Sequence, residues 1–285
     1  MKGYLVVNTF MKVEKFISLY GMLSDAFQNR GVSLEIKQAS DISLEVGKPL
    51  KEKVDFAIFW DKDIYLAERL EKSGVRLFNS KRAVELCDNK ILMYQALAFA
   101  GVKIPRTLVA PKTFEGLNYH DRYFLKEAEK EIGYPMVIKE AFGSFGEQVY
   151  LAEDEKAANE IIDKIGYKDF LMQEYIASSK GRDIRINIVG NKPIVSMLRE
   201  NKNDFRSNIS NGGTGSLYQP EQDFLDLAVK ATKALGLDFA GVDVMFGENG
   251  PIICEVNSNP QFASTLKATG VNLANFIADY ILNNL

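Results

Sequence analysis

The chain is poor in the residues on which disulfide-rich, zinc-dependent and histidine-dependent proteins rely. Its 285 residues include two cysteines, Cys87 and Cys254, and one histidine, His120. Two isolated cysteines support neither a disulfide framework nor a cysteine-based metal site, and they indicate a reducing compartment, so we expect a cytoplasmic protein. A single histidine in a polar connecting stretch argues against zinc hydrolases and Ser-His-Asp catalysis, and we expect it on the surface.

The sequence also lacks an excess of positive charge and any long apolar run. Its net charge is −3 and its pI is near 5.5, and without a basic stripe we expect no nucleic-acid partner. No run reaches transmembrane length, so we expect no membrane partner. Residues 1–10 are more typical of a first core strand than of a secretion signal. With 46% apolar and 26% charged residues, a soluble globular chain of one large or two to three small units is expected.

Short apolar runs alternate with segments of helical spacing in residues 1–84. The pattern predicts helices over 13–27 and 64–70, and strands at 4–7, 32–36, 56–60 and 75–78. This order is typical of a small α/β domain with a mostly parallel sheet. Because no glycine-rich turn follows the first strand, a Rossmann dinucleotide site is not indicated.

A helix is predicted next, over residues 80–100, with Ser80 as its cap and Gly101 as its stop. Asp88-Asn89-Lys90 interrupts it with polar residues, which either lie on a solvated face or mark a second cap at Asp88. Residues 106–134 have no firm period. We expect them to form a connection into a new unit.

A glycine-rich loop, Gly143-Ser144-Phe145-Gly146, separates two predicted strands at 135–140 and 148–151. Such a loop can fold over a phosphate chain and present backbone N–H groups to it, although taken alone it is more often a plain hairpin turn. It is not a P-loop, because no Gly-Lys-Ser/Thr ending and no helix follow. Lys139, just before the loop, favours phosphate binding.

A clean alternation of apolar and polar residues begins at Asp183 and predicts a strand. Asp183, Arg185 and Asn187 share its polar face, which in antiparallel sheets is commonly exposed to solvent. Gly190-Asn191 predicts a tight turn into a second strand at 194–199. Residues 201–216, rich in Asn, Ser and Gly, are expected to form either a mobile substrate-binding loop or a disordered connection.

Residues 239–260 predict a β-hairpin that carries acidic residues on otherwise apolar strands. If its turn is centred on Asn249, Asp243 pairs directly with Glu255, and Asn257 shares the face of Glu255. Like charges placed so destabilise a sheet unless something offsets them, and two carboxylates with an amide oxygen suit Mg²⁺. The alternative is an exposed hairpin face with scattered acids. Helices are predicted over 224–235 and within 263–285.

Five blocks of this sequence, taken in order, resemble the ATP-grasp superfamily and within it the RimK-like ligases. They are QEYI at 173–176, GRDIR at 181–185, DFRSN at 204–208, AGVDV at 240–244 and EVNSNP at 255–260. The resemblance is clearest from residue 88 to residue 270. It implies an α/β (α+β) ATP-grasp fold with an N-terminal pre-ATP-grasp domain at 1–84, a linker helix and lid subdomain with the phosphate loop at 85–175, and a C-terminal antiparallel-sheet domain with the metal site at 176–285.

The resemblance also implies a nucleotide site that binds ATP with Mg²⁺ or Mn²⁺. Lys90 and Lys139 would contact the phosphates from either side, with Lys139 also near the adenine. The remaining nucleotide contacts would come from the flap Gly143, Ser144, Phe145 and Gly146, from Gln173, Glu174, Tyr175 and Ile176 at the adenine, from Asp183 at the ribose, and from Arg206, Ser207 and Asn208. The metal ligands would be Asp243, Glu255 and Asn257.

Similar enzymes phosphorylate a carboxylate with ATP and let an amine attack the acyl phosphate. The expected partners are therefore an amino acid such as glutamate and a carboxylate-bearing peptide, protein tail or small molecule. Arg199 and Arg206 are our candidates for holding the acyl phosphate and the carboxylate, because a guanidinium presents a bidentate fork to such anions. The alternatives are a non-catalytic ATP-binding protein of the same fold, a thioester-forming ligase and a carboxylate phosphotransferase. The resemblance also allows a homo-oligomer.

The sequence departs from the family pattern in two places. The phosphate loop reads GSFGEQV, where relatives commonly carry a further glycine after the second. Beyond the metal residues, Asn259-Pro260-Gln261-Phe262 replaces the more usual Ser-Pro-Gly-Leu. The second departure leaves the identity of the acceptor open.

Overall fold

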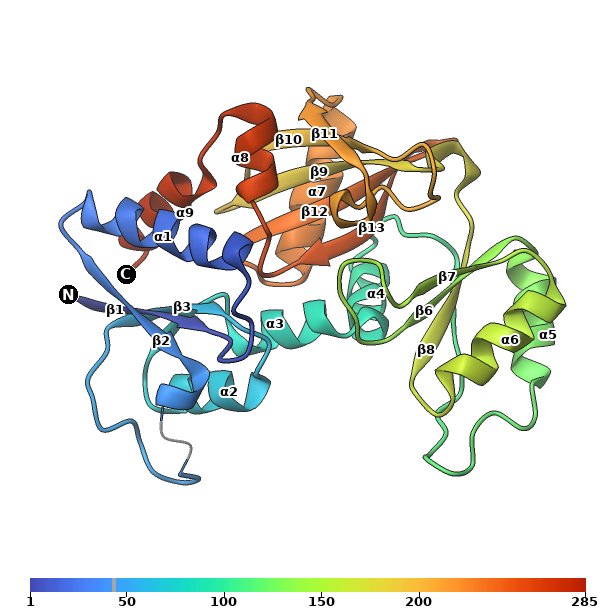
Figure 1. The fold of residues 1–285 in the computed structure, drawn as a ribbon, viewed down its shortest axis with the longest axis horizontal. Helices are drawn as coiled ribbons and strands as arrows, with labels where there is room; N and C mark the ends of the chain where they lie inside the picture. Colours follow the sequence, from blue (N-terminus) through green and yellow to red (C-terminus); the bar gives the residue numbers. More distant parts are fainter. Residues whose placement is uncertain (43–44) are drawn as a thin grey trace.

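A computed structural model describes residues 1–42 and 45–285, which form three β-sheets and the helices that cover them (Figure 1). The first sheet is entirely parallel, as its alternating pattern predicts, with the strand order β2-β1-β3-β4. Helices α1 and α2 pack on its opposite faces. The elements of this unit are β1 (Lys2–Val7), α1 (Glu14–Gln28), β2 (Ser33–Gln38), η1 (Ala39–Asp41), β3 (Phe56–Trp60), α2 (Ile64–Lys72) and β4 (Arg76–Phe78).

The middle sheet is antiparallel and has the order β5-β8-β6-β7. Helices α5 and α6 share an apolar cluster with it. The expectation of a bare connection over 106–134 is wrong, because this stretch contains the short strand β5 and the helix α5. The elements are β5 (Thr107–Val109), α5 (Tyr123–Ile132), β6 (Met136–Glu140), β7 (Val149–Ala152), α6 (Glu155–Ile165) and β8 (Phe170–Glu174).

The third sheet is antiparallel and has the order β11-β10-β9-β12-β13. Ile184, Ile186 and Ile188 of β9 face a core shared with α7. The polar residues between them do not face solvent, since Asp183 is 5% exposed and Asn187 is fully buried, so the solvated-face interpretation is wrong. The elements are η2 (Ala177–Ser179), β9 (Arg182–Val189), β10 (Lys192–Glu200), η3 (Ile209–Asn211), β11 (Thr214–Leu217), α7 (Gln222–Ala234), β12 (Phe239–Gly247), β13 (Gly250–Asn257), α8 (Ala263–Thr269) and α9 (Leu273–Leu282).

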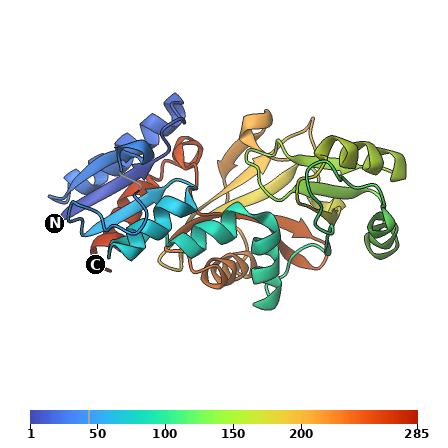
Figure 2. The same ribbon diagram turned by 90° about the horizontal axis from the view of Figure 1, so that it is seen from below.

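The predicted helix after Ser80 is divided into α3 (Lys81–Asp88) and α4 (Lys90–Phe99). Ser80 caps the first, as expected. The second cap is Asn89 rather than Asp88, since the Asn89 side chain accepts hydrogen bonds from the backbone N–H groups of Ile91 (2.9 Å) and Leu92 (3.2 Å). Both helices share the core of the third sheet, in front of which they lie in Figure 2, seen from below. The break therefore places Lys90 on the first turn of a helix packed against that sheet.

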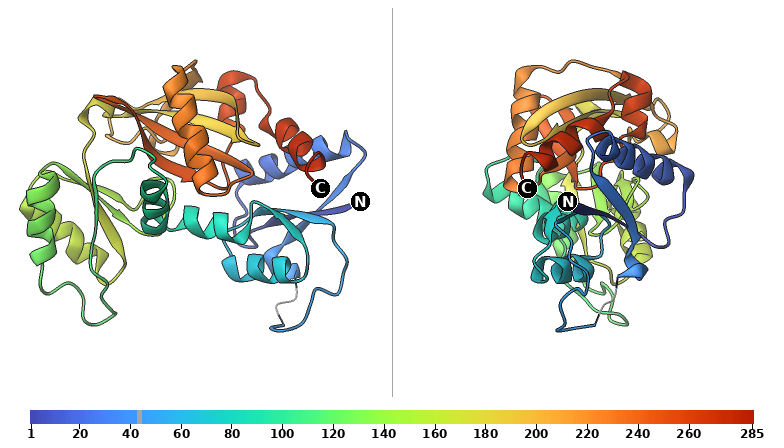
Figure 3. Two further views of the ribbon diagram at one scale, coloured as in Figure 1. Left: turned by 180° about the vertical axis from the view of Figure 1, so that it is seen from behind. Right: turned by 90° about the vertical axis from the view of Figure 1, so that its left-hand side faces the viewer.

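Helix α9 returns to the first unit and packs along α1, so that the two termini lie at the same end of the molecule (Figure 3). Arg30 reinforces this contact by pairing with Asp279 at 2.6 and 2.9 Å. Each sheet falls within one of the ranges 1–84, 85–175 and 176–285, but the helices α3, α4 and α9 pack across these divisions.

His120 is exposed, as the sequence predicts. Within residues 1–42 and 45–285, no helix combines the length and the apolar character needed to span a bilayer.

Candidate active site

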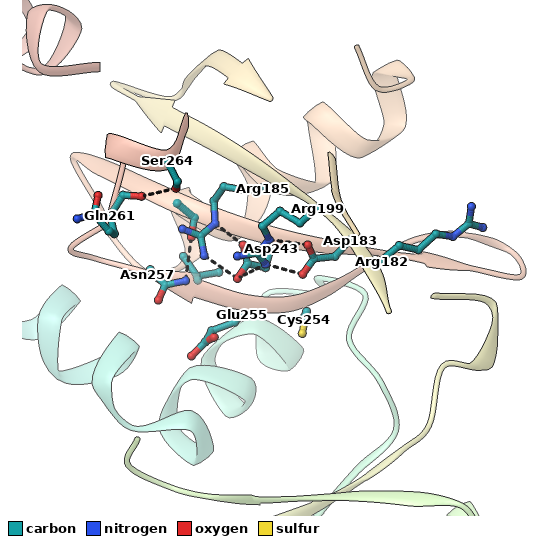
Figure 4. Close-up of polar contacts among 12 residues, drawn as sticks. Arg182, Asp183, Arg185, Arg199, Asp243, Cys254, Glu255, Asn257, Gln261 and Ser264 are labelled. Carbon is teal, nitrogen blue, oxygen red and sulfur yellow. Dashed lines mark hydrogen bonds and ion pairs between the residues drawn. The ribbon is translucent and has the colours of Figure 1, made fainter. Parts of the chain in front are cut away.

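The hairpin β12–β13 pairs Asp243 directly with Glu255, as the sequence predicts. A β-bulge immediately after Asp243 shifts the register, so that the turn closes between Gly247 and Gly250. Asn257 projects from β13 on the same side as Glu255, and both lie beside Asp243 in Figure 4. The hairpin therefore gathers the three predicted metal ligands at one edge of the third sheet.

Two arginines occupy the space around Asp243. Arg185 Nη2 lies 2.8 Å from Asp243 Oδ2, and its Nε also donates to Oδ1. Arg199 Nη2 lies 2.9 Å from the same Oδ2 and simultaneously pairs with Asp183. Burial alone would raise the pKa of Asp243, but the two guanidinium groups outweigh burial and lower it. Arginines from β9 and β10 therefore offset the charge on Asp243. The sequence predicts a metal ion in this role.

Glu255 and Asn257 have oxygens that are less engaged. The Glu255 side chain is 29% exposed and has one oxygen 3.6 Å from Lys90 Nζ. The amide of Asn257 donates weakly to the Gly241 carbonyl at 3.4 Å, which leaves its oxygen to accept. Among the described residues, no group of three or more His, Cys, Asp or Glu side chains forms a metal cluster. This donor set fits Mg²⁺ held jointly with nucleotide phosphates better than an ion held by protein alone.

A cavity between the middle and third sheets collects most of the predicted nucleotide residues. Two predicted residues, Phe145 and Asn257, do not line this cavity but line a second cavity that adjoins it. The predicted residues that line the first are Lys90, Lys139, Gly143, Ser144, Gly146, Gln173, Glu174, Tyr175, Ile176, Asp183, Arg199, Arg206, Ser207, Asn208, Asp243 and Glu255.

The two lysines approach this cavity from different elements. Lys90 Nζ on α4 donates to the Gly143 carbonyl at 3.0 Å, and Lys139 Nζ on β6 lies 3.0 Å from the Tyr94 hydroxyl. Burial raises the pKa of Tyr94 to about 12, so this hydroxyl stays protonated; it donates to the Cys254 carbonyl while it accepts from Lys139. Tyr94 therefore fixes the position of the buried Lys139 ammonium.

The loop between β6 and β7, residues 143–146, is the predicted flap, and it is tied to residues 204–211. Arg206 Nη1 donates to the Gly146 carbonyl at 2.5 Å, while Arg206 Nη2 pairs with Asp204 at 2.7 Å. The hydrogen bond from Arg206 is the main cause of the lowered pKa of Asp204. Gly146 has a φ of +76°, and a Cβ there would lie 3.0 Å from Asn208 Oδ1. The flap thus needs glycine both for its backbone conformation and for its contact with Asn208.

Sequence reasoning did not assign Arg185 or Tyr94 to the site. A signal for each was present. Arg185 lies two residues after Asp183, so both project from the same face of a strand. Tyr94 lies four residues after Lys90, on the same face of a helix.

The architecture matches solved structures over nearly the whole chain. A RimK domain protein of the ATP-grasp type from Sphaerobacter thermophilus superposes with a TM-score of 0.77 at 22% identity, covering 98% of this chain and 99% of the other. A D-alanine–D-alanine ligase from Bacillus anthracis, in complex with ATP, superposes with a TM-score of 0.71 at 17% identity, covering 99% and 96%. The fold is that of the ATP-grasp ligases.

Sequence comparison identifies the family within this fold. The RimK-like ATP-grasp domain profile matches residues 87–281. Beta-citrylglutamate synthase B of Danio rerio is 36% identical over 79% of this chain and 55% of its own length. A probable alpha-L-glutamate ligase of Vibrio parahaemolyticus is 35% identical over 77% of this chain and 71% of its own. The chain belongs to the RimK-like ATP-grasp family of ATP-dependent, amide-bond-forming ligases.

Proposed function

We propose that this protein joins a carboxylate to an amine by way of an acyl phosphate, using ATP with Mg²⁺ or Mn²⁺ and releasing ADP and phosphate. One observation carries the proposal: the lysines, the flap, Glu255 and Arg199 line the same cavity. Phosphoryl transfer depends on positioning and charge stabilisation and requires no nucleophilic side chain. The cavity supplies cations for the phosphates and acceptors for a metal ion.

The nucleotide is assigned to this cavity with its phosphates under the flap. Lys90 and Lys139 would neutralise phosphate charge, and residues 173–176 would surround the adenine. Both Asp183 oxygens already accept hydrogen bonds from Arg199, at 2.7 and 2.5 Å, so a ribose hydroxyl would use their remaining lone pairs. Arg206 would act through the flap, to whose Gly146 carbonyl it is bonded.

Glu255 and Asn257 would hold the metal ion, with Asp243 behind them. When bound, Mg²⁺ would offset the negative charge of the nucleotide phosphates. The arginines around Asp243 place positive charge next to these ligands. Asp243 Oδ2 lies next to both arginines, while Oδ1 accepts only from Arg185. A metal ion at Asp243 would use a remaining lone pair of Oδ1, or it would displace an arginine, which could then pair with a phosphate or with the substrate carboxylate.

The proposed reaction has two chemical steps, and neither uses a nucleophile from the protein. A carboxylate oxygen of the first substrate attacks the γ-phosphorus, and the bond from that phosphorus to the ADP oxygen breaks. The neutral amine nitrogen of the second substrate then attacks the acyl carbon, the C–O bond to phosphate breaks, and the proton lost by the nitrogen is taken up by the released phosphate. Arg199 lines both cavities and is our candidate for binding the anion throughout.

The substrate class is proposed from the names of the relatives. Glutamate occurs in the names of the Danio rerio and Vibrio parahaemolyticus proteins. We therefore assign an amino acid such as glutamate as one substrate, and a peptide, protein tail or small molecule bearing a carboxylate as the other.

The test is product analysis with isotope transfer. The protein is incubated with Mg²⁺, ATP and a panel of carboxylates labelled with ¹⁸O, each with a panel of amines. Formation of ADP and of phosphate carrying one ¹⁸O atom is expected for the correct pair. AMP and pyrophosphate would contradict the acyl-phosphate route. Nucleotide binding without ADP formation for any pair would favour the non-catalytic ATP-binding alternative.

A further inference from the structure

The adjoining cavity has a volume of about 410 Å³ and shares Gly143, Ser144, Arg199, Asn208 and Glu255 with the nucleotide cavity. Its remaining walls come from the N-terminal domain, the end of α3, the flap, the third sheet, η3 and the residues after β13. A molecule in this cavity would therefore lie next to the phosphate end of the nucleotide. This position is where the substrates of the proposed reaction must bind.

The walls of this cavity carry charges of both signs. Arg185 and Arg199 line it at the third sheet, and these cations suit a carboxylate or an acyl phosphate. Asp61, which directly follows β3, lines it from the N-terminal domain together with Lys15 and Lys62, and Lys62 pairs with Asp88 at 2.5 Å. Aromatic side chains, including Phe16, Tyr20 and Trp60, lie around it and can contact the carbon chain of a ligand.

Asp61 is 5% exposed, and its two carboxylate oxygens differ in their hydrogen bonds. Oδ1 accepts hydrogen bonds from Asn8 Nδ2 at 3.0 Å and from the Lys62 backbone N–H at 2.7 Å. Oδ2 is buried and has no hydrogen-bond partner anywhere in residues 1–42 and 45–285. An unpaired buried carboxylate oxygen is costly, and a donor from a ligand would remove the cost.

Asn259 provides a second acceptor beside Asp61. Its Nδ2 donates to the Asp61 carbonyl at 3.0 Å, which fixes the orientation of the amide. Its Oδ1 is also buried and lacks a partner in the part of the chain that the structure describes. Asn259 lies in the Asn-Pro-Gln-Phe segment, where the chain departs from the usual family sequence.

We propose that Asp61 and Asn259 form a subsite that binds the primary ammonium group of a substrate, a role that rests on the proposed ligase function. An ammonium group is a compact cation with three donors and no acceptor, which matches one charged and one neutral acceptor. A hydroxyl group would satisfy one acceptor and would leave the Asp61 charge without a counterion.

The electrostatic environment of Asp61 supports a cationic ligand. Burial raises the pKa of Asp61, and the hydrogen bonds from Asn8 and Lys62 oppose this effect only in part. A cation beside the carboxylate would favour its charged form. Burial, together with the charge of Asp61, raises the pKa of Tyr20 to about 12, so the neighbouring hydroxyl stays protonated.

The ammonium group could belong to the activated carboxylate substrate or to the amine substrate, whose nitrogen would have to give up one proton before it attacks. In a first arm, amino acids serve as carboxylate substrates and hydroxylamine replaces the attacking amine. Glutarate and succinate replace glutamate and aspartate as matched compounds without the amino group. If Asp61 binds the carboxylate substrate, Asp61→Asn raises the KM of the amino acids about tenfold or more and leaves the KM of glutarate and succinate unchanged.

In a second arm, N-acetylated amino acids serve as carboxylates and glutamate serves as the attacking amine. A higher KM for glutamate in Asp61→Asn, confined to this arm, assigns the subsite to the attacking amine. Asp63→Asn is the matched control, because asparagine keeps the cap that Asp63 provides to the N–H groups of Tyr65 and Leu66. Equal KM values for the wild type and Asp61→Asn in both arms overturn the proposal.

A binding measurement separates this proposal from the proposed catalysis. The twenty standard L-amino acids are titrated by calorimetry into the full chain saturated with ADP and Mg²⁺. At least one amino acid is expected to bind the wild type about tenfold more tightly than Asp61→Asn, while the affinity for ADP is the same. If no amino acid shows this difference, the subsite is refuted, whether or not the wild type forms ADP.

Discussion

Arg199 and Asp183 lie directly opposite each other on β10 and β9, and the guanidinium donates two hydrogen bonds to the carboxylate, at 2.7 and 2.5 Å. Because Arg199 also pairs with Asp243 and Asp243 pairs with Arg185, positive and negative groups alternate across three neighbouring strands. The network links the proposed ribose contact to the proposed metal site. A change at one site would therefore be transmitted to the other.

Replacing Arg199 tests this network. Arg199→Met leaves the buried Asp183 without a cation and Asp243 with only Arg185, so we expect the free energy of unfolding to fall by about 3–5 kcal/mol. ADP formation should be lost as well, because Arg199 lines both cavities. Urea unfolding measures the first effect. Lys192→Met, an exposed change on the same strand, is the control and should alter neither quantity.

Asp243 should make stability depend on pH in the acid range. Its folded pKa is lowered, so its stabilising contribution is complete above its ordinary pKa of about 3.9 and is lost as pH falls through the lowered value. The difference in unfolding free energy between the wild type and Asp243→Asn should therefore shrink as the pH is decreased from about 5 to 2.5. A difference that stays constant over this range would contradict the lowered pKa.

Glu255→Gln tests the metal assignment with little change in side-chain size. The variant should fold normally, because Glu255 is partly exposed. Its Mg²⁺-dependent turnover should fall about a hundredfold or more, since a bound metal ion contributes several kcal/mol of charge stabilisation. ADP formation is followed as Mg²⁺ is varied. Glu248→Gln, in the exposed turn of the same hairpin, should behave like the wild type, and full activity in Glu255→Gln would remove Glu255 from the site.

Gly146→Ala should weaken nucleotide binding through the flap. Alanine at a φ of +76° is strained, and its Cβ would lie 3.3 Å from the Arg206 side chain as well as close to Asn208. Gly166→Ala is a matched control, because Gly166 has a φ of +70° but a Cβ there meets no atom within 4 Å. Both variants should lose similar stability, while only Gly146→Ala lowers the affinity for ADP in calorimetry.

Tyr94→Phe removes the hydroxyl that positions Lys139. Since hydrogen bonds to charged groups contribute about 1.5–3 kcal/mol, we expect the affinity for ADP to fall about tenfold or more. Tyr280→Phe also removes a hydroxyl bonded to a charged partner, Asp238 at 3.0 Å, but lies away from the cavity. If both variants lost the same affinity for ADP, the cause would be a general destabilisation and not the loss of a positioning role of Tyr94.

The sequence predicts strands and helices well where the local pattern is strong. Strand β3 has the predicted bounds, and the Asp243–Glu255 pair follows from the hairpin alone. Strand β5 is three residues long and depends on pairing with β8, so no local period reveals it. The alternative of a cap at Asp88 lies one residue before the observed cap at Asn89, because Asp and Asn cap helices almost equally well.

The candidate site was less predictable, because its charges are arranged between strands. The sequence places Arg185 and Asp183 on one strand face, yet it does not show that this face is buried. The pairing of β9 with β10 places Arg199 on Asp183, which is 5% exposed, and the register of β12 brings Asp243 beside Arg185. The residues that follow β13 likewise approach Asp61 only after the N-terminal domain has docked.

The packing of α9 against α1 has a consequence for the order of folding during synthesis. The apolar cluster on the α1 side of the first sheet includes Leu273, Ile277 and Ile281. These residues leave the ribosome long after β4, so the first unit remains incomplete while the other two sheets are made. We expect the apolar surface on the α1 side of the first sheet to remain exposed until α9 has left the ribosome. The nascent chain would therefore be most prone to aggregation late in translation.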